Sequence, residues 1–329
     1  MEVVINQGLD ADTAIKMMEM VAKRNMLEMQ GYAQELVDQR VSWLNDQIFE
    51  KLREAPELIN TLQDPDIQST LYAAQNVFAK NGSEELGRSL IDMLVDRFAN
   101  ETMSLTAIVL NEAIATIGRL TPLQINTLTA VFVSTRIRSV TAATPGMIFS
   151  WLRENLVPVA AHVATHGADY EHLAYTGCAS IEVTSSTFGS LLSGTYPGLF
   201  PRGFSELELP LELQGKPELF MPCINDSTKL QLKFRDSDAV VSSMVQDGYV
   251  PVAVEQAKTL LKTFVQPANE IEDAVKRNVP ELEAFVNLWP STLMNQIRLT
   301  SVGLALAHAH WRQQCGGVTD LSVWIPNTK

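Results

Sequence analysis

The sequence predicts a mainly α-helical protein: a helical N-terminal bundle with a long first helix, then an α-rich C-terminal domain with a small β-sheet. Apolar residues recur every three or four positions through most of the N-terminal half, which is the period of a helix with one buried face. Residues that start or stop helices separate these stretches. They are Asp64-Pro65, Asn81-Gly82, Ser83, Ser104 and Thr121-Pro122.

The first helix is expected to run from about Asp12 to Ala55, where Pro56 stops it. Its apolar positions recur about every 3.7 residues. They are Ile15, Met18, Ala22, Met26, Met29, Ala33, Val37, Val41, Leu44, Ile48 and Leu52. A continuous helix here would be roughly 65 Å long, although Gly31 could break it into a hairpin.

The chain is therefore predicted to be a homo-oligomer that assembles through this helix, because soluble monomers rarely expose a large apolar stripe. Met18, Met26 and Met29 are the candidate interface residues, and filling a core is their alternative role. The segment Val3–Ile5 has the composition of a short strand, which could add across such an interface.

A short helix around Glu57–Gln63 follows, and the stretch Leu90–Leu128 is predicted to be the centre of the fold. Four polar residues near its apolar faces form a predicted structural polar core: Asp96, Arg97, Asn111 and Glu112. Polar groups near a core must be hydrogen-bonded or paired, so a carboxylate and the guanidinium are expected to join adjoining helices. A catalytic carboxylate pair is the alternative, and it would need a cleft.

A domain boundary is expected near residue 144, giving a helical bundle and assembly domain (1–143) and an α-rich domain with a small sheet (144–329). Glycine and proline are frequent from Gly167 to Pro222, where only short helices fit. Lys229–Phe234 alternates with period two and predicts a strand, which could pair with a second strand at Leu321–Ile325. Helices are expected between them at about 237–246, 252–265, 268–277, 280–288 and 300–314.

Composition and charge narrow the class of protein. The net charge of −13 opposes nucleic-acid binding, which needs a basic face. Three cysteines without a C-x-x-C pair suit a reducing cytosol better than a disulfide scaffold. The start of the sequence lacks the pattern of a signal peptide, and no apolar stretch reaches the roughly 20 residues that span a membrane. We expect a cytoplasmic protein with no membrane partner.

Two histidine pairs could carry chemistry. His162 and His166 are one helical turn apart, which is metal-ligand spacing, but Val163 stands where the zinc-protease signature needs a glutamate. Surface histidines at a helix end are the favoured interpretation, so no metal and no cofactor is predicted. His308 and His310 are two positions apart and would point to different faces of a helix.

Two further features have a structural and a functional interpretation. Cys178 follows a glycine in a turn-rich stretch, and a buried structural thiol is favoured over a nucleophile. The segment Tyr196–Phe204 is dense in turn formers and aromatics and lacks phosphate-loop spacing. Tyr196 and Phe200 are expected to insert into a core or, alternatively, into an interface.

Several stretches taken together resemble one protein family. They are LVDR, IVLNEAI and LTPLQ (residues 94–124), LAYTGCASI and YPGLFPRGF (173–204), and LTSVGLALAHAHW and LSVWI (299–325). In this order they resemble an uncharacterised bacterial family known by locus-tag names. The resemblance implies a soluble bacterial protein, offers no catalytic residues to carry over, and suggests a setting in conflict or phage defence.

The leading hypothesis from the sequence is therefore a non-enzymatic protein that acts by self-assembly or by binding another bacterial protein. A metal-dependent hydrolase that uses His162 and His166 is the first alternative. The second is a nucleic-acid sensor in which the C-terminal helices and strands form a winged helix.

Overall fold

The computed structural model describes the backbone of residues 11–326 and the side chains of residues 30–326. It confirms a mainly α-helical fold, with two small antiparallel sheets among the described residues. Val3–Ile5 lies outside the described residues. No helix in the described part is long and apolar enough to cross a membrane.

The chain divides into two compact units, residues 1–102 (unit 1) and 103–329 (unit 2). This division precedes the boundary that the sequence suggested near residue 144. The helices at Leu105–Ile117 (α4) and Pro122–Arg136 (α5) pack against the helix at Ser301–Cys315 (α14), and they therefore belong to unit 2.

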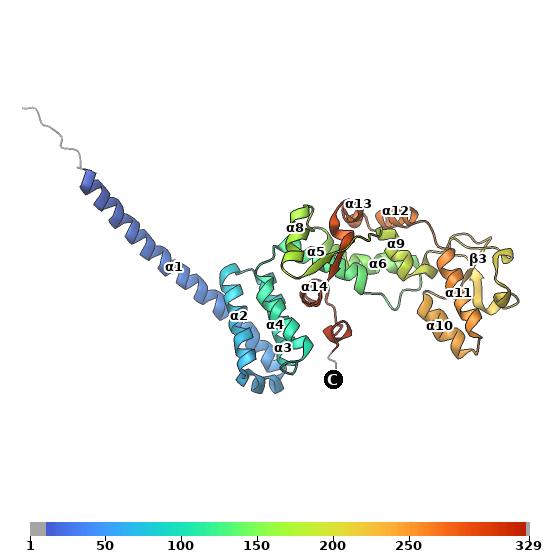
Figure 1. Cartoon of the computed structure of the whole chain (residues 1–329), viewed down its shortest axis with the longest axis horizontal. Coiled ribbons are helices and arrows are strands. Elements are labelled where there is room, and N and C mark those ends of the chain that lie inside the picture. The colour runs from blue at the N-terminus through green and yellow to red at the C-terminus, as the bar shows by residue number, and fades with distance from the viewer. Residues whose placement is uncertain (1–10, 327–329) are drawn as a thin grey trace, which may run out of the picture. The chain divides into compact units, whose positions relative to one another are not determined.

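Unit 1 contains a long helix, a 3₁₀ helix and two shorter helices (Figure 1): α1 (Ala11–Glu54), η1 (Pro56–Gln63), α2 (Pro65–Asn81) and α3 (Glu84–Phe98). The backbone of α1 continues through Gly31 without a break. The start and stop signals of α2 act as predicted. The side chain of Asp64 accepts a hydrogen bond from the backbone N–H of Asp66 at 2.8 Å, and Gly82 ends the helix with a φ of 71°.

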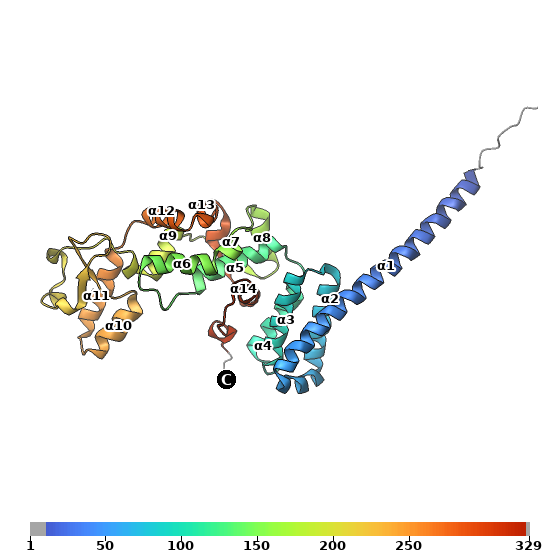
Figure 2. The same ribbon diagram turned by 180° about the vertical axis from the view of Figure 1, so that it is seen from behind.

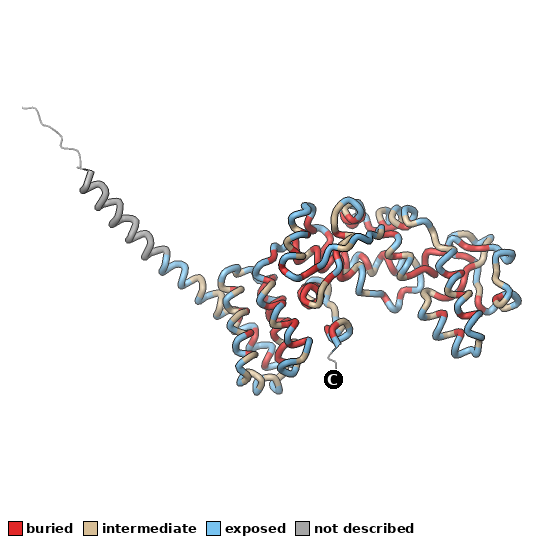
Figure 3. Tube along the Cα trace, viewed as in Figure 1, coloured by how far each residue is buried: buried red, intermediate tan, exposed pale blue. Residues whose placement is uncertain are grey.

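Only the second half of α1 has buried side chains among those described (Figure 3). They are Leu44, Ile48 and Leu52. Trp43 stacks on Phe78 of α2 with ring centroids 5.1 Å apart, and Nη1 of Arg40 donates to the carbonyl oxygen of Ala79 at 2.8 Å. By contrast, every residue at positions 30–35 is exposed. Among the described residues, the C-terminal half of α1 is therefore the part that packs within unit 1.

Unit 2 is built around α14, in which every residue from Val302 to Trp311 is buried. It packs most closely against α5 and α4. Figures 1 and 2 show α14 beside α5 from opposite sides. The other helices of this part are α6 (Pro145–Asn155), α7 (Val157–Ala160), α8 (Gly167–Tyr175), α9 (Phe188–Thr195), α12 (Ala268–Asn278) and α13 (Glu283–Ser291).

One small sheet supports the start of α14. Strand β1 (Ala179–Ile181) pairs antiparallel with β4 (Ile297–Leu299). The backbone then turns into α14 so closely that a Cβ on Gly303 would lie 1.9 Å from the carbonyl oxygen of Cys178. Only glycine fits at this contact, because any side chain would overlap the backbone of Cys178, which is the residue before β1.

The second sheet belongs to a part of unit 2 with its own apolar core, around residues 204–264. It pairs β2 (Phe220–Pro222) with β3 (Leu230–Leu232), beside α10 (Ser237–Gln246) and α11 (Pro251–Thr263). Figure 1 shows these elements together at one end of unit 2. The strand predicted at 229–234 is therefore present, although it is shorter than expected.

The strand expected at Leu321–Ile325 is instead a 3₁₀ helix, η8 (Leu321–Val323). The side chain of Asp320 accepts a hydrogen bond from the backbone N–H of Ser322 at 2.7 Å, which starts a helical turn. The carbonyl oxygen of Ile325 accepts a hydrogen bond from Oγ1 of Thr106 at 3.0 Å. The expected pairing with β3 does not form, so the sheet proposed for a winged helix is not built from these two segments.

Candidate functional site

Arg97 on α3 is a fully buried charged residue. Its Nη2 donates to Oδ2 of Asp66 in the first turn of α2, and its Nη1 donates to the carbonyl oxygen of Asn100 at 3.0 Å. A buried guanidinium is costly without a carboxylate, so this pair holds α3 against α2. Beside it, Oγ1 of Thr102 donates to Oδ2 of Asp64 at 2.6 Å, and this hydrogen bond lowers the pKa of Asp64.

Of the four residues of the predicted polar core, Arg97 is the fully buried one. Asp96 and Asn111 are half-buried, and Glu112 is exposed on α4. A carboxylate that pairs with Arg97 belongs to Asp66, 31 positions earlier in the chain. Sequence analysis missed it because an acidic residue in the first turn of a helix is already explained by the helix dipole.

His162 and His166 do not share a helix. Both are exposed in the segment between α7 and α8, and His166 is the N-cap residue of α8. The spacing of one helical turn on which the metal hypothesis depended is therefore not realised. Within the described part of the chain, no group of three histidine, cysteine, aspartate or glutamate side chains is placed to hold a metal.

The two histidines of α14 are buried and face different partners, as the spacing predicted. Nε2 of His308 lies 2.6 Å from the carbonyl oxygen of Thr319, and Nε2 of His310 lies 3.0 Å from Oδ1 of Asn126 on α5. Burial lowers the pKa of His310 to about 4, so its imidazole is neutral at pH 7. These residues connect α14 to its surroundings and share no common site.

Cys178 lies between α8 and β1 and is fully buried. Burial raises the pKa of its thiol, while Oγ1 of Thr176 lies 3.5 Å from its sulfur. A buried thiol with a raised pKa is a poor nucleophile, because the thiolate is the reactive form. The structural interpretation of Cys178 fits this environment.

Tyr196 and Phe200 are also buried, and only 3 % and 1 % of their surfaces are exposed. The hydroxyl oxygen of Tyr196 accepts a hydrogen bond from the backbone N–H of Ser139 at 2.7 Å. Both aromatic residues therefore pack inside unit 2 instead of lying on an open surface, because the turns around them direct the chain inward.

The candidate interface on α1 lies partly outside the described side chains, which begin at residue 30. Met18, Met26 and Met29 belong to its helical backbone, but their side chains lie outside the described residues. Nearer its C-terminal end, α1 and η1 border a groove of about 490 Å³. Phe49 and Ile59 line this α1–η1 groove and remain 57 % and 49 % exposed. Large apolar side chains exposed beside a groove are typical of a contact surface.

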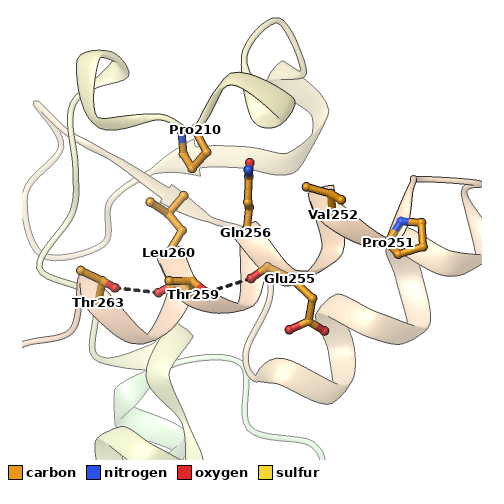
Figure 4. A pocket seen from close by; sticks show the side chains of 8 residues that line it. All are labelled: Pro210, Pro251, Val252, Glu255, Gln256, Thr259, Leu260 and Thr263. Atoms are coloured by element: carbon orange, nitrogen blue, oxygen red, sulfur yellow. Dashed lines mark hydrogen bonds between the residues drawn. The ribbon is translucent and has the colours of Figure 1, made fainter.

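A second groove, of about 460 Å³, lies on α11, and sequence analysis did not predict it. Figure 4 shows Pro210 on one side and the side chains of α11 on the other. Along α11 the lining residues are Pro251, Val252, Glu255, Gln256, Thr259, Leu260 and Thr263. The spacing of three and four residues between them could have indicated this surface from the sequence, because it places them on one face of the helix predicted at 252–265.

Gln256 is the polar residue that stands out in this α11 groove. Figure 4 shows its side chain projecting from α11 into the space beside Pro210. Its Oε1 is buried and has no hydrogen-bond donor among the described residues. Buried polar atoms are normally satisfied, so this oxygen indicates a place where a donor from outside could bind.

Comparison with known proteins identifies a family. The model of an uncharacterised protein family matches residues 8–325, which is nearly the whole chain. No curated protein and no solved structure matches the chain significantly.

Proposed function

The chain belongs to the uncharacterised family whose model spans residues 8–325, and we propose that it acts by self-association through α1 and by binding a protein partner. In this proposal the chain carries out no catalysis. Each copy contributes its long N-terminal helix to a symmetric contact between the copies.

The exposure of α1 at positions 30–35 is the observation that supports this proposal most. Isolated helices are marginal in water and gain most of their stability from packing along an apolar face. Here the helical backbone extends from Ala11, whereas the first buried residue among the described side chains of α1 is Leu44. The apolar stripe in the sequence runs through the same stretch, and a second copy of α1 would cover it.

A two-fold arrangement is the simplest form of such an assembly, because closed dimers are the commonest oligomers. The groove between α1 and η1 lies on the same helix, and its exposed Phe49 and Ile59 would add apolar area to the contact. Tyr32, which is 71 % exposed on α1, would add to it as well.

Light scattering on the full-length protein and on a variant that lacks residues 1–35 tests the proposal. This truncation keeps Leu44 and the other buried residues of α1, so unit 1 retains its packing. We expect an oligomer for the full chain and a monomer for the shortened one. A monomeric full-length protein at micromolar concentration, or the same mass per particle in both, contradicts the proposal.

A substitution in the full chain separates the apolar stripe from the length of α1. Met18→Glu combined with Met26→Glu places charges on the stripe and should dissociate the oligomer. Gln39→Glu combined with Gln47→Glu adds the same charge at exposed positions of the same helix that do not belong to the stripe, and this pair serves as the matched control. Equal dissociation by both pairs would indicate a general charge effect instead of a specific contact.

We place this activity in the bacterial cytosol. The three cysteines are free, which suits a reducing compartment. The family resemblance implies a setting in phage defence, and this setting is part of the proposal. Phage plating on cells with and without the gene tests it, and equal plaque numbers for a broad phage panel would contradict the setting.

A further inference from the structure

The α11 groove presents an almost entirely apolar surface, even though two threonines line it. Oγ1 of Thr259 donates to the carbonyl oxygen of Glu255 at 2.9 Å, and Oγ1 of Thr263 donates to that of Thr259 at 2.8 Å. Figure 4 draws both hydrogen bonds along the helix. Because these hydroxyls bond to the helix itself, a ligand would meet mainly carbon atoms here.

Gln256 is the exception, because its buried Oε1 lacks a donor. Leaving a buried acceptor unpaired destabilises a protein, so a ligand that donates a hydrogen bond at this atom gains affinity. The Gln256 side chain lies between Leu260 and Val252 and beside Pro210, where that bond would be shielded from water. The groove therefore suits a ligand with an apolar body and an N–H or O–H group.

The apolar surface continues beyond the groove. Val245 near the end of α10 and Val250 and Val252 at the start of α11 are 60 %, 58 % and 56 % exposed. Three half-exposed valines around one turn are more than a small ligand in the groove would cover. A longer ligand that extends from the groove along this turn fits the surface better.

Charge indicates which ligand is favoured. Glu206 is exposed and Glu212 is half-buried on the segment that carries Pro210, and neither forms an ion pair among the described residues. Glu255 lines the groove and is paired with Lys258 at 2.8 Å. Two carboxylates without an ion-pair partner, on the segment that contributes Pro210 to the groove, favour basic residues in the ligand.

We propose that the α11 groove binds an extended peptide segment of a partner protein in which apolar side chains alternate with basic ones. One backbone N–H of this segment donates to Oε1 of Gln256. The segment is extended because the N–H groups within a helix are already bonded to its own carbonyls. The proposal concerns unit 2 and does not depend on self-association through α1.

Fluorescence anisotropy with the full-length protein tests this inference. The probe is a labelled peptide of alternating valine and lysine. Two matched peptides replace either lysine by glutamate or each backbone N–H by N–CH₃. We expect the valine–lysine peptide to bind and both matched peptides to bind at least about threefold more weakly, as the loss of charge attraction or of one hydrogen bond predicts.

Variants of the protein locate the site. Gln256→Leu should weaken binding of the valine–lysine peptide about threefold to tenfold, which is the loss expected for one hydrogen bond. Val252→Lys should weaken it at least as much. Val318→Lys, at an exposed valine outside the groove, is the matched control and should leave affinity unchanged.

Thermal unfolding of Gln256→Leu separates binding from folding. Replacing an unpaired buried acceptor with an apolar group should leave the melting temperature unchanged or raise it. Equal affinity of Gln256→Leu and the unaltered protein, or equal affinity for the N-methylated peptide, overturns the proposal. So does a change in oligomer mass caused by Val252→Lys, which would identify the occupant as a second copy of this chain.

Discussion

Arg97 and Asp66 form an ion pair whose two halves differ in environment. The guanidinium side chain is completely buried, whereas 42 % of the carboxylate side chain is exposed. The aspartate therefore remains partly hydrated, while the arginine depends on protein partners for its hydrogen bonds. Because of this asymmetry, we expect Arg97 to be the residue that destabilises unit 1 more when its partner is removed.

Asp66→Ala should lower the free energy of unfolding by about 1–3 kcal/mol, because it removes a charged hydrogen-bond partner of a buried guanidinium. Glu112→Ala, at an exposed position, should change the free energy by less than about 0.5 kcal/mol. Urea unfolding followed by circular dichroism measures both. Equal losses in the two variants would show that Arg97 does not need Asp66.

The two glycines of α9 should respond to alanine in opposite directions. A Cβ on Gly189 would lie 2.1 Å from the carbonyl oxygen of Ala268 at the start of α12, whereas a Cβ on Gly194 meets nothing within 4 Å. We expect Gly189→Ala to destabilise the protein by about 1–3 kcal/mol through overpacking. Gly194→Ala should stabilise it by up to about 1 kcal/mol, because alanine favours the helix.

Melting temperatures of these two variants and of the unaltered protein give the comparison. Because Gly189 and Gly194 lie on the same short helix, a shared change in the helix cannot explain opposite signs. A Gly189→Ala protein that melts like the unaltered one would show that α9 and α12 can separate without cost.

His310 should make stability depend on pH. Its pKa is about 4 in the folded state and 6.5 ordinarily, so the unfolded chain binds a proton between these values and the folded protein does not. Stability is therefore greatest above pH 6.5 and falls as the pH decreases towards 4. Between pH 7 and pH 5 the loss from this residue should be about 2 kcal/mol.

Urea unfolding at both pH values measures this loss. His310→Gln should be less stable at pH 7 but should lose about 2 kcal/mol less than the unaltered protein on going to pH 5. His162→Gln, at an exposed histidine, is the control and should keep the full loss. An unchanged pH dependence in His310→Gln would mean that other groups cause it.

The three thiols should be slow to react in the folded protein. Cys178 and Cys223 are buried, and burial raises the pKa of Cys315 to about 11. Titration with a disulfide reagent at pH 8 should detect less than one thiol per chain before unfolding and three afterwards. Fewer than three after unfolding without reductant would reveal a disulfide and contradict the cytosolic proposal.

Local signals predicted most of the helices. The capping box of Thr121 and Gln124 forms as expected, with hydrogen bonds of 3.2 and 3.0 Å between each side chain and the other residue's backbone N–H. The left-handed stop at Gly82 is also present. Such signals act within four residues, so the sequence alone is enough to read them.

Contacts between distant residues were harder to predict. Asp66 reaches Arg97 from another helix, and β1 pairs with β4 across more than a hundred residues. Each of these strands is three residues long, too short to show alternation. The α11 groove depends on the separate segment that contains Pro210, so no pattern within α11 could predict its second side.

The position of α14 has a consequence for the synthesis of the protein. This helix fills the centre of unit 2, and its His310 lies 184 positions after its partner Asn126. While the ribosome is still translating the residues between them, α4 and α5 have emerged without the helix that covers their apolar faces. Unit 1 can fold during this time, whereas the packing of α4 and α5 against α14 must wait until residues 301–315 leave the ribosome.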